Sequence, residues 1–164
     1  MKDKCRVVAL VGMGGIGKTS LAVKLKEQIQ GEFEHVIEES LKNAPPLQEL
    51  LGSWLKVFSN QENKDIPDSI GNRIVSVMDF LSKNRCLLLL YDVDKILQAG
   101  KLVGQYREGY EEYDQLFKRV AERSYESCLL LISRDKPQTI ESLEKTQLLV
   151  KCLQLQGLDD VAAK

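Results

Sequence analysis

Long apolar segments and an excess of one charge sign are both missing from this sequence of 164 residues. The longest uninterrupted apolar run covers residues 86–91, which is far too short to span a bilayer, so no transmembrane helix is expected. Lys and Arg number 23 against 24 Asp and Glu, and the net charge is −1. This near balance excludes a broad electrostatic attraction, so we predict neither nucleic acid nor a membrane as a partner.

Cysteine and histidine are scarce as well. The four cysteines, Cys5, Cys86, Cys128 and Cys152, are widely separated and form no C-x-x-C pair. We interpret them as buried free thiols, which suits a reducing cytosol. No signal peptide is visible, because the apolar N-terminal stretch runs directly into glycines, and we expect a cytoplasmic protein. The only histidine, His35, is expected to pack or to lie on the surface rather than to act in catalysis.

Short apolar runs alternate with segments of helical periodicity along the chain. Three of the runs lack polar alternation, which is typical of strands buried on both faces of a sheet. The runs cover residues 6–11, 34–37, 86–91, 128–133 and 147–152. The helical stripes are Leu21, Leu25 and Ile29; Leu47, Leu50, Leu51, Trp54, Leu55 and Phe58; Ile70, Ile74, Val77, Met78 and Leu81; and Tyr113, Leu116, Phe117 and Val120. We therefore predict an α/β fold, a three-layer α/β/α sandwich around a mainly parallel five-stranded sheet.

Two segments and one residue outside the strands bear on the packing. Residues 135–146 are polar and contain one proline, so we expect a loop or a short irregular helix there. Tyr106, Tyr110 and Tyr113 could stack on bases, but their helical spacing favours packing. Trp54 lies in an apolar stripe and is expected in the core.

A glycine-rich segment separates the first apolar run from the first helical stripe. Residues 12–19 match G-x-x-x-x-G-K-S/T, the P-loop pattern, in the strand-then-helix context that this pattern requires. In such a loop, glycines let successive N–H groups face a phosphate, and the following helix adds its positive end. We therefore predict a P-loop NTPase that binds ATP or ADP through Gly12, Met13, Gly14, Gly15, Ile16, Gly17, Lys18, Thr19 and Ser20.

Two side chains of this loop have distinct predicted roles. Lys18 should neutralise the terminal phosphates, and the Thr19 hydroxyl should complete the shell of a Mg²⁺ ion otherwise held by water and phosphate oxygens. The same glycines also spell G-x-G-x-x-G, so a dinucleotide-binding Rossmann site is an alternative, with Glu38 or Glu39 as its acidic residue. The Lys18-Thr19 pair favours the P-loop.

A P-loop ATPase also needs an acidic residue at the end of a neighbouring strand. The run at 86–91 is followed by Asp92 and, two residues later, by Asp94. We predict that Asp92 serves Mg²⁺ through water and takes part in catalysis. Asp94 is equally consistent with a role in the site and with an ordinary helix N-cap.

These motifs resemble the NB-ARC domain, a signalling ATPase module of the STAND group, and residues 32–51 and 104–120 look like its bacterial members in particular. The resemblance covers nearly the entire chain and is carried by GMGGIGKTSLAVKL at 12–25, YDVD at 91–94 and LLLISRDKP at 129–137. It implies that Arg134 is the sensor arginine, which reads the terminal phosphate from the end of the fourth strand. Without the motif match, an arginine after a strand is most often a surface charge.

One residue departs from the family pattern. In the family the strand commonly ends in Asp-Asp or Asp-Asn, the first serving magnesium and the second often proposed as the base. Aligned on the leucines, Tyr91 takes the first place and Asp92 the second. An unperturbed phenol stays protonated at neutral pH and cannot replace a carboxylate for magnesium. Either Asp92 serves the metal, or Thr19, phosphates and water hold it, and in both cases we expect weak hydrolysis.

Three functions stay open at this point. The leading hypothesis is a switch in which ADP holds a parent protein closed, ATP reorganises neighbouring domains and slow hydrolysis resets it, with Lys18, Asp92 and Arg134 as catalytic residues. A small-molecule or nucleotide kinase would need an arginine-bearing lid, for which Arg134 with Lys136 is the only candidate. A non-hydrolysing interaction module would keep the shape of the P-loop but would not hydrolyse ATP.

The two ends of the chain suggest further domains. Few residues precede the P-loop, and residues 158–164 look like the opening turn of another helix. We therefore expect a nucleotide-binding domain at 1–157 and the start of a truncated helical domain at 158–164. The resemblance implies a helical and a winged-helix domain as partners, and a homo-oligomer on activation. Without these domains we expect loose nucleotide binding.

Overall fold

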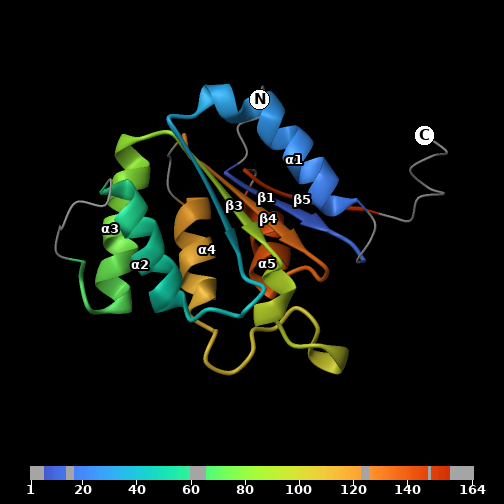
Figure 1. Ribbon diagram of the computed structural model, residues 1–164. Coiled ribbons are helices and arrows are strands. Elements are labelled where there is room, and N and C mark those ends of the chain that lie inside the picture. Colours follow the sequence, from blue (N-terminus) through green and yellow to red (C-terminus); the bar gives the residue numbers. More distant parts are fainter. Residues whose placement is uncertain (1–5, 14–16, 60–65, 123–125, 148, 156–164) are drawn as a thin grey trace.

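The computed structural model describes residues 6–13, 17–59, 66–122, 126–147 and 149–155 (Figure 1). Predictions that concern Cys5, residues 14–16 and residues 158–164 lie outside these ranges. The strands are β1 (Val7–Val11), β2 (His35–Ser40), β3 (Cys86–Tyr91), β4 (Cys128–Ser133) and β5 (Val150–Gln154). The helices are α1 (Lys18–Ile29), α2 (Leu47–Phe58), α3 (Ile70–Lys83), α4 (Tyr113–Glu122) and α5 (Gln138–Thr146), with short 3₁₀ turns η1 (Gln30–Glu32), η2 (Val93–Ile96) and η3 (Gly100–Leu102).

The strands form one sheet in the order β2-β3-β4-β1-β5, and every neighbouring pair is parallel. The predicted α/β fold with a five-stranded parallel sheet is therefore confirmed. Since all strands run the same way, their carboxyl ends meet at one edge, where ligands bind in open α/β sheets. β4 lies between β1 and β3, so the segments that follow β1, β3 and β4 share that edge.

Helices cover both faces of the sheet, with α1 on one face and α2 to α5 on the other (Figure 1). Side chains of β1 alternate between the two layers, as the period of a strand requires. Val7, Ala9 and Val11 pack with α2 to α5, whereas Leu10 packs with Ala22 of α1. β3 and β4 are buried on both faces, in agreement with their unbroken apolar runs.

Two segments differ from the prediction. Residues 138–146 form the regular α-helix α5 rather than a loop or an irregular helix, because Thr139, Ile140 and Leu143 make a short buried stripe among polar residues. β2 continues three residues beyond the apolar run that predicted it and ends at Ser40. Its last residues pair with β3, Ser40 opposite Tyr91, so the hydrogen-bonded ladder outlasts the hydrophobic pattern.

The core contains the aromatic residues that were predicted to pack. Trp54 is 1% exposed, and its indole N–H has no hydrogen-bond partner within the described residues. Of the three tyrosines only Tyr113 lies in α4, so the helical spacing used to interpret them was wrong. Packing is nevertheless their role, because Tyr106 and Tyr113 are buried and the Tyr110 hydroxyl donates to the Ala44 carbonyl at 2.6 Å.

The cysteines behave largely as predicted. Cys86 and Cys128 are buried, and Cys152 is half-buried. Burial raises the pKa of the Cys86 thiol to about 11. None of the helices in the described ranges is long and apolar enough to cross a bilayer.

Candidate nucleotide-binding site

Helix α1 begins at Lys18, directly after the glycine-rich segment. Gly17 precedes it with a φ of 92°, a left-handed conformation that suits glycine and strains other residues. Gly17 provides no side-chain cap, and the first turn of α1 contains no acidic residue. The first N–H groups of α1 are therefore left to an external anion, which the helix dipole also attracts. Gly14, Gly15 and Ile16 lie outside the described residues.

A cavity of about 790 Å³ opens where α1 begins and where β3 and β4 end, a volume typical of ligand sites. It brings together the predicted residues Lys18, Thr19, Asp92 and Arg134, although they come from three separate parts of the chain. The lining residues are Gly17, Lys18, Thr19, Ser20, Ser40, Tyr91, Asp92, Asp94, Lys95, Ile132 and Arg134.

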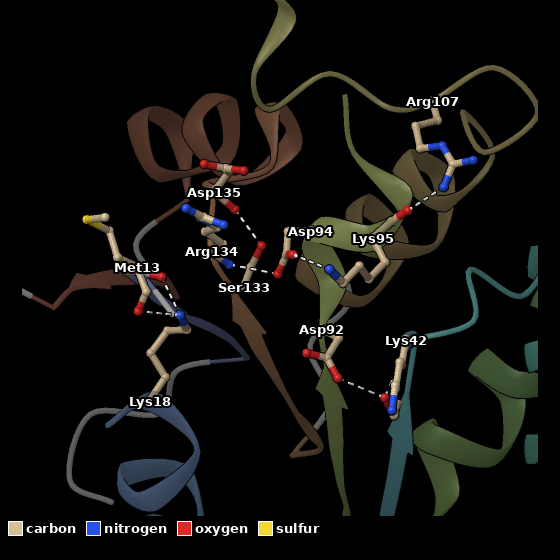
Figure 2. A network of polar contacts seen from close by, with 12 residues as sticks. Met13, Lys18, Lys42, Asp92, Asp94, Lys95, Arg107, Ser133, Arg134 and Asp135 are labelled. Carbon is tan, nitrogen blue, oxygen red and sulfur yellow. Dashed lines mark hydrogen bonds and ion pairs between the residues drawn. The ribbon is translucent and has the colours of Figure 1, made fainter. Parts of the chain in front are cut away.

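The ammonium of Lys18 donates hydrogen bonds to the carbonyls of Gly12 and Met13, the latter at 3.0 Å (Figure 2). Burial lowers its pKa below the ordinary lysine value, and the nearby Asp94 carboxylate opposes this shift. A phosphate oxygen is a stronger acceptor than a neutral carbonyl, so an incoming phosphate can replace these two bonds. The Gly12 N–H donates to the Ser133 carbonyl at 3.2 Å and so continues the sheet.

Asp92 follows β3 in a left-handed conformation, with φ 57° and ψ 39°. Its Oδ2 accepts a hydrogen bond from the Ser40 hydroxyl at 3.0 Å. The Ser40 oxygen in turn accepts the Lys42 N–H at 3.1 Å, which leaves the hydroxyl proton for Asp92. The end of β2 thus holds one carboxylate oxygen and leaves the other to a ligand.

Asp94 and Arg134 are joined across the ends of β3 and β4. The Oδ1 atom of Asp94 accepts the backbone N–H of Arg134 at 2.9 Å (Figure 2). The helix N-cap interpretation of Asp94 is therefore wrong, since Asp94 lies inside η2 and binds another segment. The Arg134 side chain is exposed and lines the cavity, and its guanidinium makes no hydrogen bond or ion pair with another described residue.

The profile of the NB-ARC domain family matches residues 1–154. The chain belongs to the NB-ARC family. It is 39% identical over 167 residues to an uncharacterized WD repeat-containing protein of Nostoc sp. (strain PCC 7120), a match that covers 97% of this chain and 13% of that protein. Disease resistance protein RPV1 of Vitis rotundifolia is 30% identical over 103 residues, which cover 60% of the chain and 7% of that protein. The chain spans a small part of both relatives.

Solved structures with low sequence identity share the fold. Cdc6p of Pyrobaculum aerophilum has a TM-score of 0.62 at 12% identity, over 91% of this chain and 38% of that chain. The Aeropyrum pernix ORC2 protein, solved as ADPNP-ADP complexes, has a TM-score of 0.54 at 16% identity, over 93% and 42% of the two chains. The NB-ARC resemblance and the P-loop NTPase fold predicted from the sequence are confirmed, so the chain is a nucleotide-binding NB-ARC domain.

The hydroxyl of Tyr91 contacts the neighbouring strand β2. It donates to Glu38 Oε1 at 2.8 Å, and Glu38 also forms an ion pair with Lys26 of α1, likewise at 2.8 Å. Burial and the Glu38 carboxylate raise the pKa of Tyr91 to about 12. The phenol therefore stays protonated at neutral pH and donates toward β2, which leaves Asp92 as the first carboxylate after β3.

The dinucleotide-binding alternative does not fit this NB-ARC sheet. A Rossmann site needs its acidic residue on the strand beside β1, but β3 and β4 separate β2 from β1. Both candidate carboxylates are also engaged elsewhere. Glu38 pairs with Lys26, and Glu39 accepts the Ser53 hydroxyl of α2 at 2.8 Å.

The donor set of the NB-ARC cavity fits a Mg²⁺ ion that arrives with the nucleotide. No group of three or more His, Cys, Asp or Glu side chains in the described part of the chain could hold a metal. The cavity instead offers the Thr19 hydroxyl and the Asp92 carboxylate, whereas the Asp94 carboxylate is bonded to the Arg134 amide. Mg²⁺ commonly takes one or two protein ligands and completes its shell with phosphates and water, so this set is sufficient.

Sequence reasoning missed three lining residues, namely Ser40, Lys95 and Ile132. Ser40 was hidden because β2 was expected to end earlier, before two glutamates. A polar residue at the carboxyl end of any parallel strand is a candidate for the site, and this rule finds Ser40 once the observed end of β2 is known. Lys95 lies in η2, a short 3₁₀ turn that hydrophobic periodicity in the sequence does not predict.

Proposed function

We propose that this NB-ARC domain is a switch of the STAND type, which distinguishes ATP from ADP and hydrolyses ATP weakly. The observation that supports it is the guanidinium of Arg134, which has no ion pair with a described residue and lines the same cavity as Lys18 and the start of α1. A switch of this kind depends on a group that meets one nucleotide and not the other.

The proposed preference for ATP over ADP follows from the different segments of the chain on which the cationic groups lie. The start of α1 and Lys18 come from one segment and would hold the phosphates that ATP and ADP share. Arg134 follows β4 and would contact the additional phosphate of ATP. A planar guanidinium binds phosphate oxygens in pairs, so this contact would favour ATP.

Weak hydrolysis follows from the carboxylates that remain. Tyr91 offers no charge, Asp94 is bonded to the Arg134 amide, and Asp92 shares one oxygen with Ser40. We propose that Asp92 serves Mg²⁺ through water and that Thr19 coordinates the ion directly. The remaining Asp94 oxygen lies 4.0 Å from the ammonium of Lys95, so among the described residues of the cavity no unpaired carboxylate is left to activate the attacking water, and turnover would be slow.

The proposal also includes the larger protein in which this switch would act. The relatives are far longer than this chain, which suits a domain that controls others within a larger protein. We propose helical and winged-helix neighbours, a cytoplasmic location and assembly on activation. The kinase alternative would need Arg134 and Lys136 together in a lid, and Lys136 instead forms an ion pair with Glu144 of α5.

Calorimetric titration of Mg-ATP and Mg-ADP tests the proposal. Lys18→Ala should weaken both nucleotides by about tenfold or more, which corresponds to about 1.4 kcal/mol. Arg134→Ala should weaken ATP by about tenfold and leave ADP unchanged, because a charged hydrogen-bond pair with a single phosphate is lost. Lys24→Ala and Arg119→Ala remove the same charges from exposed helix positions away from the cavity and should change neither affinity.

Two results would contradict the proposal. Unchanged nucleotide affinity in Lys18→Ala would show that the P-loop is not the binding site. Equal losses of ATP and ADP in Arg134→Ala would remove the sensor. Release of ADP from Mg-ATP, measured beside these titrations, separates the alternatives: turnover that requires an added acceptor indicates a kinase, and binding with no turnover indicates an interaction module.

A further inference from the structure

The turn directly after β3 is joined to the first residue after β4 by a hydrogen bond between a side chain and the backbone. β3 and β4 are parallel neighbours, with Leu90 opposite Leu131, so their carboxyl ends lie side by side. Asp94 lies in the turn after β3, and Arg134 is the first residue after β4. The Asp94 carboxylate accepts the Arg134 N–H at 2.9 Å, and this bond closes the gap between the two segments (Figure 2).

A second hydrogen bond, made by the preceding residue, also holds the backbone at Arg134. The carbonyl of the preceding residue, Ser133, accepts the N–H of Gly12 at 3.2 Å, which ties the end of β4 to the end of β1. The Arg134 N–H is held by Asp94 on the other side. A hydrogen bond to a carboxylate is stronger than one between neutral groups, and only 18% of the Asp94 side chain is exposed. The starting point of the Arg134 side chain is therefore fixed from two directions.

The charge of Asp94 is unfavourable for phosphate binding. Asp94 lines the same cavity as Lys18, Lys95 and Arg134, and a carboxylate there repels an incoming phosphate and neutralises part of the cationic field. Its Oδ2 lies 4.0 Å from the ammonium of Lys95, whose side chain is 54% exposed, so this ion pair contributes little. A carboxylate at this place therefore requires a benefit other than affinity for anions.

We propose that Asp94 is a positioning residue that sets the Arg134 backbone, so that the guanidinium meets the terminal phosphate of ATP with little loss of freedom. The inference rests on the proposed switch and adds its second component. A binding group that is already ordered loses less conformational entropy on binding, and that gain applies to ATP, because the Arg134 contact is made to ATP alone. Asp94 thereby increases the preference for ATP while it lowers the affinity for both nucleotides.

Two substitutions separate these opposite effects. Asp94→Asn keeps a carbonyl oxygen of the same reach and so can still accept the Arg134 N–H, whereas it removes the charge. Asp94→Ala removes both. We expect both variants to bind ADP more tightly than the parent, by a similar factor. The preference for ATP over ADP should fall about fivefold in Asp94→Ala, the value of one lost hydrogen bond, and stay within about twofold in Asp94→Asn.

Calorimetric titration of Mg-ATP and Mg-ADP into both variants, Arg134→Ala and the double variant Asp94→Ala/Arg134→Ala measures these preferences. Since Asp94 acts through Arg134, the double variant should show the same preference as Arg134→Ala alone. A merely structural role would change the affinities for ATP and ADP equally and would add to the effect of Arg134→Ala.

The outcomes distinguish this inference from the switch itself. If Arg134→Ala abolishes the preference and Asp94→Ala keeps it, the switch stands and the positioning role is refuted. If Arg134→Ala changes nothing, the sensor and the positioning role both fail. An equal loss of preference in Asp94→Asn and Asp94→Ala would assign the effect to charge and overturn the inference. If far-ultraviolet circular dichroism shows that Asp94→Ala does not fold, Asp94→Asn decides alone: a retained preference supports the role, and a lost one refutes it.

Discussion

Asp92 combines a backbone conformation and a side-chain contact that few residues can satisfy together. Its φ of 57° lies in the left-handed region, which Asp and Asn tolerate better than other non-glycine residues. Its carboxylate accepts the Ser40 hydroxyl and borders the cavity. The backbone turn after β3 and the chemistry of the site thus favour the same small acidic residue.

Substitution of Asp92 separates these two demands. Asp92→Asn keeps the turn and the Ser40 contact but removes the charge, so the protein should fold normally while Mg²⁺-dependent ATP turnover falls by about tenfold, as is common when a group that acts on a metal through water is changed. Asp92→Ala should in addition lower the free energy of unfolding by about 1 kcal/mol, because alanine is strained at this φ. Urea denaturation and ADP release measure the two effects. Turnover at the parent rate in Asp92→Asn would exclude a role for this carboxylate beside the metal.

At the scale of single residues, motif chemistry predicted the side chains whose function requires one residue type. Lys18, Thr19 and Asp92 were predicted because phosphate and magnesium select particular side chains, and Arg134 was predicted from the family resemblance; all four line one cavity. Lys95 was not, because its position depends on a 3₁₀ turn. The Asp94 contact with Arg134 was also out of reach, since it joins residues 40 positions apart through a pairing of strands.

At the scale of elements, the sequence predicted the helices that bury a continuous apolar stripe and the strands that bury an unbroken apolar run. β3 and β4 have no polar interruption, and α2 to α4 each bury several residues, so their existence followed from periodicity. The end of β2 and the helix α5 did not, because hydrogen bonding and a few buried contacts outweigh a polar composition there. Such segments depend on their neighbours more than on their own pattern.

Helix α3 begins with a cap whose contribution can be measured. Ser69 precedes the helix, and its hydroxyl accepts the Asn72 N–H at 3.1 Å, one of the free donors of the first turn. Ser69→Ala should lower the free energy of unfolding by about 1 kcal/mol. Ser82→Ala is the matched control, since Ser82 is exposed in the last turn of α3 and its hydroxyl donates to the Asp79 carbonyl. Equal stability losses in the two variants would contradict a capping role for Ser69.

At the scale of the whole molecule, tyrosine hydroxyls connect segments that are distant in the sequence. Tyr113 of α4 donates to the Pro45 carbonyl before α2 at 2.8 Å, and Tyr106 is hydrogen-bonded to Thr139 of α5. Tyr91 connects the end of β3 to β2. The three phenols therefore tie α4 to the segment before α2, the segment before α4 to α5, and β3 to β2, and burial raises the pKa of all three.

These phenols make the fold sensitive to alkaline pH. An unfolded tyrosine releases its proton near pH 10, whereas Tyr91 in the folded chain does so at about 12, and the pKa values of Tyr106 and Tyr113 are also raised. The folded state then binds more protons than the unfolded state above pH ~10. Their stabilising contribution is complete below that pH and is lost as the pH rises above it, at up to about 1.4 kcal/mol per pH unit for each phenol.

Urea denaturation at a series of pH values between 7 and 12 measures this loss, and Tyr113→Phe assigns part of it. The variant should be less stable than the parent at pH 7 by about 1 kcal/mol, because the Pro45 carbonyl loses its donor, yet should lose less stability at high pH. Trp54→Phe is the control: it changes a non-titrating aromatic residue of the same core, so it should lower stability by a similar amount at every pH. Trp54→Phe should therefore keep the parent's dependence of unfolding free energy on pH. If Tyr113→Phe keeps it as well, the buried phenol of Tyr113 does not contribute to the loss of stability at alkaline pH.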